Sequence, residues 1–165
     1  MTAISGIGSK RPGWQTTIMF ALGFWLSASL MVDLAIMPSL YLAGMMSQSG
    51  FAVAGYIIFG IFNRLELLCA ALTVTGLLVL QRSQPNFFKA DYRPVALSAI
   101  LLSIALIYTY ILTPEMSALG LQLNLFAPAT TPAAMSQMHW AYWLLEVSKL
   151  AISGTLLGWC YRRQG

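Results

Sequence analysis

Four long apolar stretches alternate with shorter polar or turn-rich segments along the chain. A transmembrane helix needs about 20 predominantly apolar residues to cross a hydrocarbon core of about 30 Å. The pattern therefore predicts an all-α protein, an integral membrane antiparallel four-helix bundle, in which residues 14–161 form a single four-span domain. The expected spans cover about residues 15–41, 51–81, 94–112 and 140–160.

Prolines and small polar residues set the expected limits of these spans. Residues 1–13 are rich in Gly, Ser, Lys and Arg and are predicted to be a mobile cytoplasmic tail. Pro38 predicts a kink near the end of the first span, and Pro114 predicts the end of the third. The long segment 113–139 is nearly uncharged and is predicted to be a loop with a short interfacial helix around 115–123.

The second span is unusual because Arg64 and Glu66 interrupt it. The apolar stretch that follows, Leu67–Leu80, has only 14 residues and is too short to cross a bilayer alone. The helix must therefore bring both charged residues into the membrane or its interface. We expect one long helix with a bend; the alternative is that Phe51–Ile61 lies partly along the outer surface.

The cations are distributed asymmetrically between the two sides of the expected membrane domain. Seven of the nine Lys and Arg residues flank the spans on one side, and the segments 42–50 and 113–139 contain none. Such an asymmetry places the positive side in the cytoplasm. It predicts a multi-pass protein of the plasma membrane or another energy-coupling membrane, with both termini cytoplasmic. The seven flanking cations are Lys10, Arg11, Arg82, Lys89, Arg93, Arg162 and Arg163.

Composition supports the membrane assignment and narrows the partners. The chain of 165 residues is 58% hydrophobic and only 8% charged, whereas soluble domains carry about 25% charged residues. The net charge is +4, and we interpret its cations as residues that hold the helix ends at anionic lipid. The bilayer is therefore an expected partner, and nucleic acid is not. Cys69 and Cys160 differ in depth by roughly 15 Å at about 1.5 Å per residue, too far for a disulfide.

Five ionisable side chains from three different spans fall at one level in the outer half of the membrane. Their expected depths are roughly 18 to 28 Å from the cytoplasmic helix ends at about 1.5 Å per residue. Tyr108 and Tyr110 of the third span reach the same level. Charges at such depth normally face the protein interior and pair with one another. The five residues are Asp33, Arg64, Glu66, Glu146 and Lys149.

Spacing along the helices suggests how these charges pair. Glu146 and Lys149 are three residues apart on one helical face and can pair directly. Arg64 and Glu66 diverge, so Arg64 is expected to bridge to Asp33 or Glu146. Three acids against two bases leave one carboxylate to be protonated, hydrated or bound to a ligand. The network either pins the helices together or lines a polar cavity for a proton, an ion or a small ligand.

Two further patterns lie elsewhere on the last span. Met135, Met138 and His139 combine thioether and imidazole groups that suit Cu(I), and a His/Met pair could ligate haem. The simpler interpretation is an interfacial histidine that begins a helix among packing methionines, with no cofactor. Gly154 and Gly158 form a GxxxG pattern that allows close helix approach within the bundle or to another subunit.

Four short motifs within about residues 16–160 carry a resemblance to a known family. They are Gly23 with Pro38, Phe59–Leu65, Thr113–Met116, and His139 through Gly158. In these motifs the chain resembles the four-span membrane proteins of domain-of-unknown-function group 4149, the family that includes transmembrane protein 205. The resemblance implies four membrane helices, a distant similarity to copper-resistance D-type membrane domains, and no established reaction. The chain departs from the family by carrying Glu146 and Lys149, where neutral polar residues are expected.

These patterns favour a non-enzymatic function over catalysis. We expect a small integral membrane protein that acts as an accessory, assembly or scaffolding subunit of a membrane complex, bound to a membrane-protein partner or to further copies of itself. One alternative is a transporter-like or ligand-binding module built on the intramembrane charges. Another is a copper- or haem-handling membrane protein that uses His139.

Overall fold

A computed structural model describes residues 13–45, 48, 50–83, 91–126 and 133–162. These residues form four long helical rods and contain no β-strand. Two of the rods are interrupted by a π-helical turn. The first rod comprises α1 (Gly13–Met31), η1 (Val32–Ile36) and α2 (Met37–Leu42); the second is α3 (Phe51–Ser83); the third comprises α4 (Arg93–Ile107), η3 (Tyr108–Leu112) and α5 (Thr113–Phe126); and the fourth is α6 (Ala133–Arg162).

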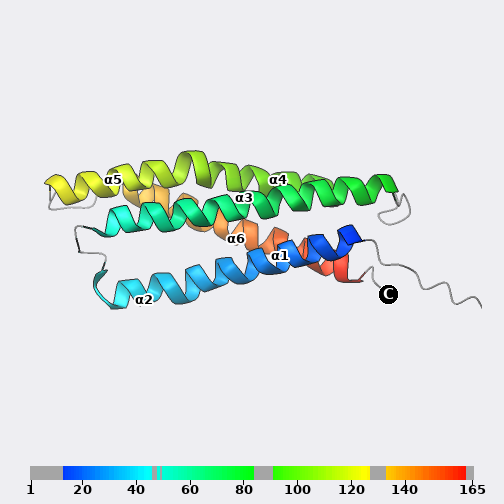
Figure 1. The fold of residues 1–165 in the computed structure, drawn as a ribbon. Coiled ribbons are helices and arrows are strands. Elements are labelled where there is room, and N and C mark those ends of the chain that lie inside the picture. Colours follow the sequence, from blue (N-terminus) through cyan, green and yellow to red (C-terminus); the bar gives the residue numbers. More distant parts are fainter. Residues whose placement is uncertain (1–12, 46–47, 49, 84–90, 127–132, 163–165) are drawn as a thin grey trace, which may run out of the picture.

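The four rods lie side by side, and successive rods run in opposite directions (Figure 1). Helix α1 packs against α3 and α6, and α4 packs against the same two helices from the other side. Three helices are long and apolar enough to cross a membrane; α6, which contains Glu146 and Lys149, falls outside this set. The chain is therefore an all-helical membrane protein. The three helices cover Gly13–Leu42, Val53–Ser83 and Arg93–Gly120.

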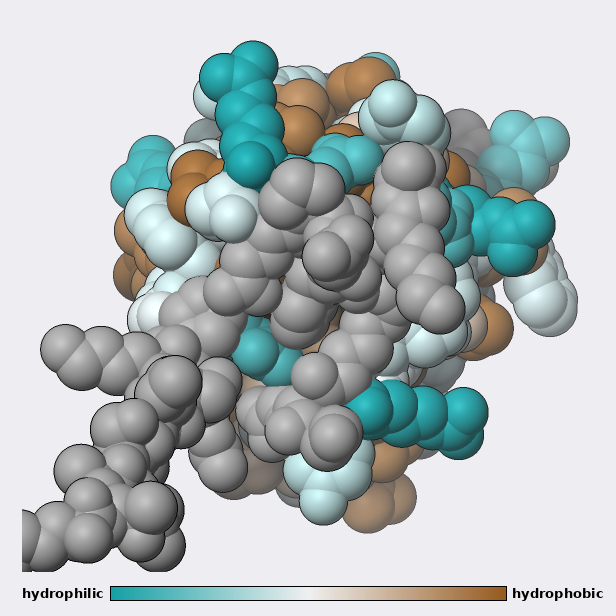
Figure 2. All heavy atoms as spheres, turned by 90° about the vertical axis from the view of Figure 1, so that its right-hand side faces the viewer, coloured by the Kyte–Doolittle hydropathy of each residue, from teal (hydrophilic) through white to brown (hydrophobic). Residues whose placement is uncertain are grey.

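The basic residues that flank the helices gather at one end of the molecule. Arg82 lies in the last turn of α3, Arg93 begins α4, and Arg162 lies in the last turn of α6. These three helix ends lie together at the right of Figure 1. Figure 2 views this end directly and shows hydrophilic side chains at its margin. Lys10, Arg11, Lys89 and Arg163 lie outside the described residues, as does the predicted tail up to residue 12.

The prediction that Pro114 ends the third span is wrong. The backbone stays helical through Thr113, whose φ is −64° and ψ is −46°, and continues as α5. Proline lacks an N–H and clashes with the preceding turn of a regular α-helix. Here the Thr113 N–H instead reaches back to the Tyr108 carbonyl, which closes the wider π turn η3. The segment 113–126 is therefore an extension of a long helix and not a loop with a separate interfacial helix.

The same combination of a π turn and a proline occurs in the first rod. The Met37 N–H donates to the Val32 carbonyl and closes η1, and Pro38 follows in the first turn of α2. A proline is tolerated in a first helical turn because its missing donor is not required there. The sequence predicted a kink near Pro38. The structure has a π turn just before this proline, and the α-helix resumes as α2.

The second and fourth rods are single helices with different limits from those predicted. Helix α3 runs without interruption over 33 residues, so Phe51–Ile61 continues the span instead of forming a separate surface segment. Helix α6 begins at Ala133, seven positions before the predicted start at Trp140. His139 therefore lies inside α6 and does not begin it. The predicted loop 113–139 shrinks accordingly, and residues 127–132 lie outside the described part.

An apolar core joins the four rods along the half of the molecule that carries the basic helix ends. Trp25, Ile18 and Leu77 are among its largest buried side chains. Cys69 and Cys160 are buried within it and form no disulfide, in line with the prediction that they do not pair. The buried members are Ile18, Leu22, Trp25, Cys69, Ala70, Leu77, Leu80, Leu101, Ala105, Leu156 and Cys160.

Gly76 brings α1 and α3 into close contact. A Cβ atom at this position would lie 2.6 Å from Cγ1 and 2.9 Å from Cδ1 of Ile18. Ile18 is fully buried, so it has little room to move. The absence of a side chain at Gly76 is therefore a packing requirement. Gly60, on the same helix, has no atom within 4 Å of its added Cβ.

We predict that Gly76→Ala destabilises the protein whereas Gly60→Ala does not. Overpacking a well-filled core costs about 1–3 kcal/mol. At the open site, alanine is favoured over glycine in a helix by up to about 1 kcal/mol. Thermal unfolding of the detergent-solubilised variants, followed by circular dichroism, measures the difference. Equal melting temperatures for the two variants would contradict the close packing of α1 on α3.

Candidate functional site

Lys149 is buried between two glutamates in the middle of the helices. Its Nζ lies 2.5 Å from Oε1 of Glu66 on α3 and 2.7 Å from Oε2 of Glu146 on its own helix. Lys149 is 2% exposed, and each glutamate is 1% exposed. The predicted pairing of Glu146 with Lys149 is confirmed, and the ion triad also joins α6 to α3.

Aromatic rings enclose the remaining sides of the Lys149 ammonium. Its Nζ lies 5.8 Å from the ring centre of Phe62 and 5.2 Å from that of Tyr108. A cation within about 6 Å of an aromatic centre is attracted by the ring quadrupole, and more strongly so where water is excluded. These contacts add α4 and its π turn to the surroundings of the lysine.

Helix α1 supplies hydrogen-bond donors to Glu66. Trp25 Nε1 donates to Oε1 at 2.9 Å, and Ser29 Oγ lies 3.5 Å from the same oxygen. Together with Lys149, these groups gather three donors around a single carboxylate oxygen. Buried charges need such partners, because an unpaired carboxylate in an apolar interior is very costly. Glu66 is consequently the point where α1, α3 and α6 are tied together.

Two tyrosines extend the network to Asp33. Tyr108 Oη donates to Glu146 Oε2 at 3.0 Å and lies 3.2 Å from the Tyr142 carbonyl oxygen. Tyr142 Oη donates to Asp33 Oδ1 at 2.9 Å. Asp33 lies in η1 and Tyr108 in η3, so each π turn contributes one residue to the site. π-Helical turns occur frequently at functional sites.

Two carboxylate oxygens of this network have no hydrogen-bond donor among the described residues. They are Oδ2 of Asp33 and Oε1 of Glu146, and both atoms are buried. Most buried polar atoms in native proteins have a partner, so these two oxygens mark a place where a proton, a water molecule or a ligand could bind. The expected count of three acids against two bases does not hold, because Arg64 is exposed and Lys149 is the one base of the described network.

Two residues assigned to the network from the sequence lie outside it. Arg64 is exposed on α3 and forms no ion pair within the described part of the chain, so the predicted bridge to Asp33 or Glu146 is wrong. Tyr110 is 71% exposed. The reason is the same for both: two positions along a helix correspond to a rotation of about 200°. Because Glu66 and Tyr108 point inward, Arg64 and Tyr110 point outward.

Sequence reasoning missed Trp25, Ser29 and Tyr142. A signal for each was present in the spacing, because Trp25 and Ser29 precede Asp33 by eight and four positions and Tyr142 precedes Glu146 by four. Residues four apart share a helical face. Tyrosines near helix ends are common as interfacial anchors in membrane proteins, so Tyr142 does not by itself indicate a buried site. Asn63 and Thr113 form a smaller polar contact nearby, at 2.7 Å between Nδ2 and Oγ1.

The predicted metal residues follow one another along the first turns of α6. His139 is exposed and Met138 is half-buried, while the side chain of Met135 lies outside the described part. Within the described ranges, no group of three or more His, Cys, Asp or Glu side chains is placed to hold a metal ion. Copper or haem binding at His139 therefore stays a prediction from the sequence, without a donor set to support it.

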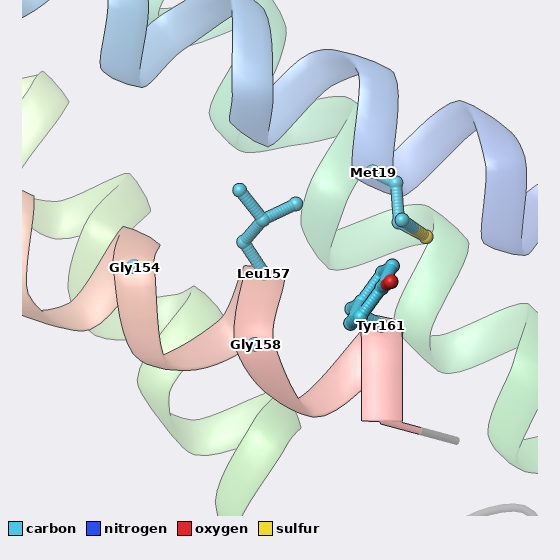
Figure 3. Close-up of a pocket in the computed structure, with 5 residues that line it drawn as sticks. All are labelled: Met19, Gly154, Leu157, Gly158 and Tyr161. Carbon is cyan, nitrogen blue, oxygen red and sulfur yellow. The ribbon is translucent and has the colours of Figure 1, made fainter. Parts of the chain in front are cut away.

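Gly154 and Gly158 line an open apolar groove between α1 and α6. Figure 3 shows Leu157 and Tyr161 beside the two glycines on α6, with Met19 facing them from α1. The groove has a volume of about 420 Å³. A Cβ atom added to either glycine would have no atom within 4 Å. Of the two uses predicted for the GxxxG pattern, close packing within the chain is therefore not realised.

Comparison with protein-family models, with curated proteins and with solved structures finds no match to this chain. The resemblance to the four-span family stays a prediction from its motifs. The case for function therefore rests on two features of the structure: the buried network and the open groove.

We predict that removing the Lys149 charge destabilises the protein strongly. Lys149→Met leaves Glu66 and Glu146 buried without a counter-charge, and breaking a buried pair costs roughly 3–5 kcal/mol. The matched change Arg64→Met removes an exposed charge that has no ion pair among the described residues, and we expect it to leave the melting temperature nearly unchanged.

Thermal unfolding in detergent compares the two variants directly. Adding Glu66→Gln to Lys149→Met should restore part of the lost stability, because it removes one of the two stranded charges. A Lys149→Met variant as stable as the unmodified protein would show that the ion triad does not hold the helices together.

Proposed function

We propose that this protein is a non-enzymatic accessory, assembly or scaffolding subunit of a membrane complex, and that it binds a transmembrane helix of its partner in the groove between α1 and α6. The observation that carries the proposal is the open GxxxG pair. Gly154 and Gly158 present bare backbone to the outside of the molecule. No residue of the described chain fills the space above them.

Close backbone approach is how helices associate within a bilayer. Lipid tails are as apolar as leucine, so helix association depends on van der Waals packing at small residues and on interhelical hydrogen bonds. Leu157 and Tyr161 lie beside the glycines on α6, and Met19 faces them from α1 (Figure 3). The side chains form the walls of the groove, and the two glycines leave its floor open. An apolar helix with small residues of its own fits such a surface.

Arg64 favours a different protein as the partner over a second copy of this chain. It lies exposed on α3 among the apolar, exposed side chains of Ile57, Ile61 and Leu68. A charge in such surroundings normally has a counter-charge. The acids at its level in this chain, Asp33 and Glu66 among them, belong to the interior network. A partner with its own acidic residue would complement Arg64.

We further infer the membrane topology from the charged helix ends. Four antiparallel spans with both termini in the cytoplasm place Arg82, Arg93 and Arg162 on the cytoplasmic side, as the positive-inside rule requires. Helix α6 can be the fourth span despite its charges. Glu146 and Lys149 form an ion pair inside the protein, and both side chains are almost fully buried.

We predict that Gly154→Leu/Gly158→Leu releases the partner. The leucines would fill the groove and keep a second backbone away. Thr155→Leu adds similar bulk at an exposed neighbouring position that does not line the groove, and it should retain the partner. Native mass spectrometry of the protein, gently extracted from its own membrane, gives the readout.

The masses separate the alternatives. The proposal is supported if the unmodified protein and Thr155→Leu both give the mass of the chain plus its partner. The double variant should then give only the mass of the lone chain. A lone chain in every sample, or a partner that survives the double variant, overturns the proposal. A mass of two copies of this chain would contradict the assignment to a different partner protein.

The topology makes a separate prediction for single cysteines. Gln48→Cys, between the first and second rods, should react from outside the cell with a membrane-impermeant maleimide. Tyr92→Cys, which replaces a 73% exposed side chain before α4, should react only after permeabilisation. The native Cys69 and Cys160 are buried, so the unmodified protein is the unlabelled control. Labelling of both sites from the same side would exclude a span between them.

A further inference from the structure

The Asp33–Glu146 carboxyl pair has a feature that partner binding does not use. The two side chains come from η1 and α6 and are linked through Tyr142, which donates its hydroxyl to Asp33 and lies one helical turn before Glu146. Each carries one buried oxygen without a donor, Oδ2 on Asp33 and Oε1 on Glu146. Glu146 is almost wholly buried, so no bulk water is at hand to solvate its orphan oxygen.

The groups around the pair do not balance its charge. From α3 comes Glu66, from α6 come Tyr142 and Lys149, and from η3 comes Tyr108, while α1 contributes only the neutral Trp25 and Ser29. Three ionised carboxylates against one ammonium would leave a net charge of −2. Lys149 is already held by two carboxylates, and each tyrosine hydroxyl already donates to one.

Two carboxylates that each bury an oxygen without a donor cannot both stay ionised at low cost. Like charges that share a site favour protonation of one of them. A proton taken from bulk solution forms an O–H bond on one carboxyl group, and no other bond breaks. The new hydroxyl can donate to the orphan oxygen of the other carboxylate. One proton thereby satisfies both oxygens and removes one negative charge.

We propose that Asp33 and Glu146 form a proton-binding site in which the two carboxyl groups share one proton inside the helical core. The inference goes beyond partner binding and does not depend on the groove. A metal cation suits the location less well, because hard cations such as Ca²⁺ or Mg²⁺ take six or more oxygen ligands. The described residues offer two orphan oxygens.

Hydrogen bonds fix the geometry of this site. Tyr142 holds Oδ1 of Asp33, and Tyr108 with Lys149 holds Oε2 of Glu146. The second oxygen of each carboxyl group is therefore left for the shared proton. Because Asp33 and Tyr108 lie in the two π turns, these irregular turns are part of the proton site and not incidental distortions.

Infrared difference spectroscopy of the protein in lipid nanodiscs tests the proposal. At neutral pH the unmodified protein should show a carboxylic-acid C=O stretching band that shifts in D₂O. Asp33→Asn and Glu146→Gln should each abolish the band, because the introduced amide donates to the remaining carboxylate in place of the proton. Glu115→Gln, at an exposed position on α5, should retain it.

Isotope labelling keeps the test informative where a substitution prevents folding. The chain contains only two aspartates, Asp33 and Asp91, so ¹³C-aspartate in an Asp91→Asn background labels one site. A shift of the acid band with ¹³C-aspartate or with ¹³C-glutamate supports the shared proton. Three results would overturn the proposal. The acid band could be absent at neutral pH, or it could survive both Asp33→Asn and Glu146→Gln. It could also disappear when Na⁺ is added at constant pH.

Discussion

The burial of Lys149 between Glu66 and Glu146 is the interaction on which the rest of the structure depends. An ammonium group enclosed by apolar helices is tolerable only when counter-charges and hydrogen bonds surround it. That requirement sets the rotation of α6 and α3 about their own axes, because both must turn these side chains inward. Trp25 and Ser29 then fix α1 against Glu66. The apolar core is nonspecific by comparison, since leucines and alanines accept several registers.

The two π turns connect this charged centre to the backbone. Each is followed by a residue and then a proline, Pro38 in the first rod and Pro114 in the third. The wider turn lets the helix continue through a residue that lacks a donor. It also places Asp33 and Tyr108 where they meet α6. A proline that would be read as a helix end thus becomes part of how the site is built.

The molecule separates its polar chemistry from its outer surface. The ion triad is enclosed by packed side chains, whereas the outer surface of the spans exposes many large apolar side chains. That surface also carries the glycine groove between α1 and α6 and the exposed Arg64 on α3. Arg64 and Glu66 lie only two residues apart, yet one faces outward and the other inward. The proposed proton site and the proposed partner surface therefore lie on different faces of the same helices.

The sequence by itself determined the helical class, the apolar stretches that span a membrane, and the clustering of basic residues at helix ends. It also determined the Glu146–Lys149 pair. All of these depend on composition or on spacing within one helix, where geometry is known in advance. Only the tertiary structure decided that Arg64 and Tyr110 face outward, that Tyr142 reaches Asp33, that α5 continues past Pro114, and that Gly154 stays uncovered. The continuation past Pro114 depends on the π turn that precedes it, and the other three facts depend on how each helix is rotated against its neighbours. That rotation is set by many weak contacts and one buried ion triad between distant parts of the chain, which no local pattern records.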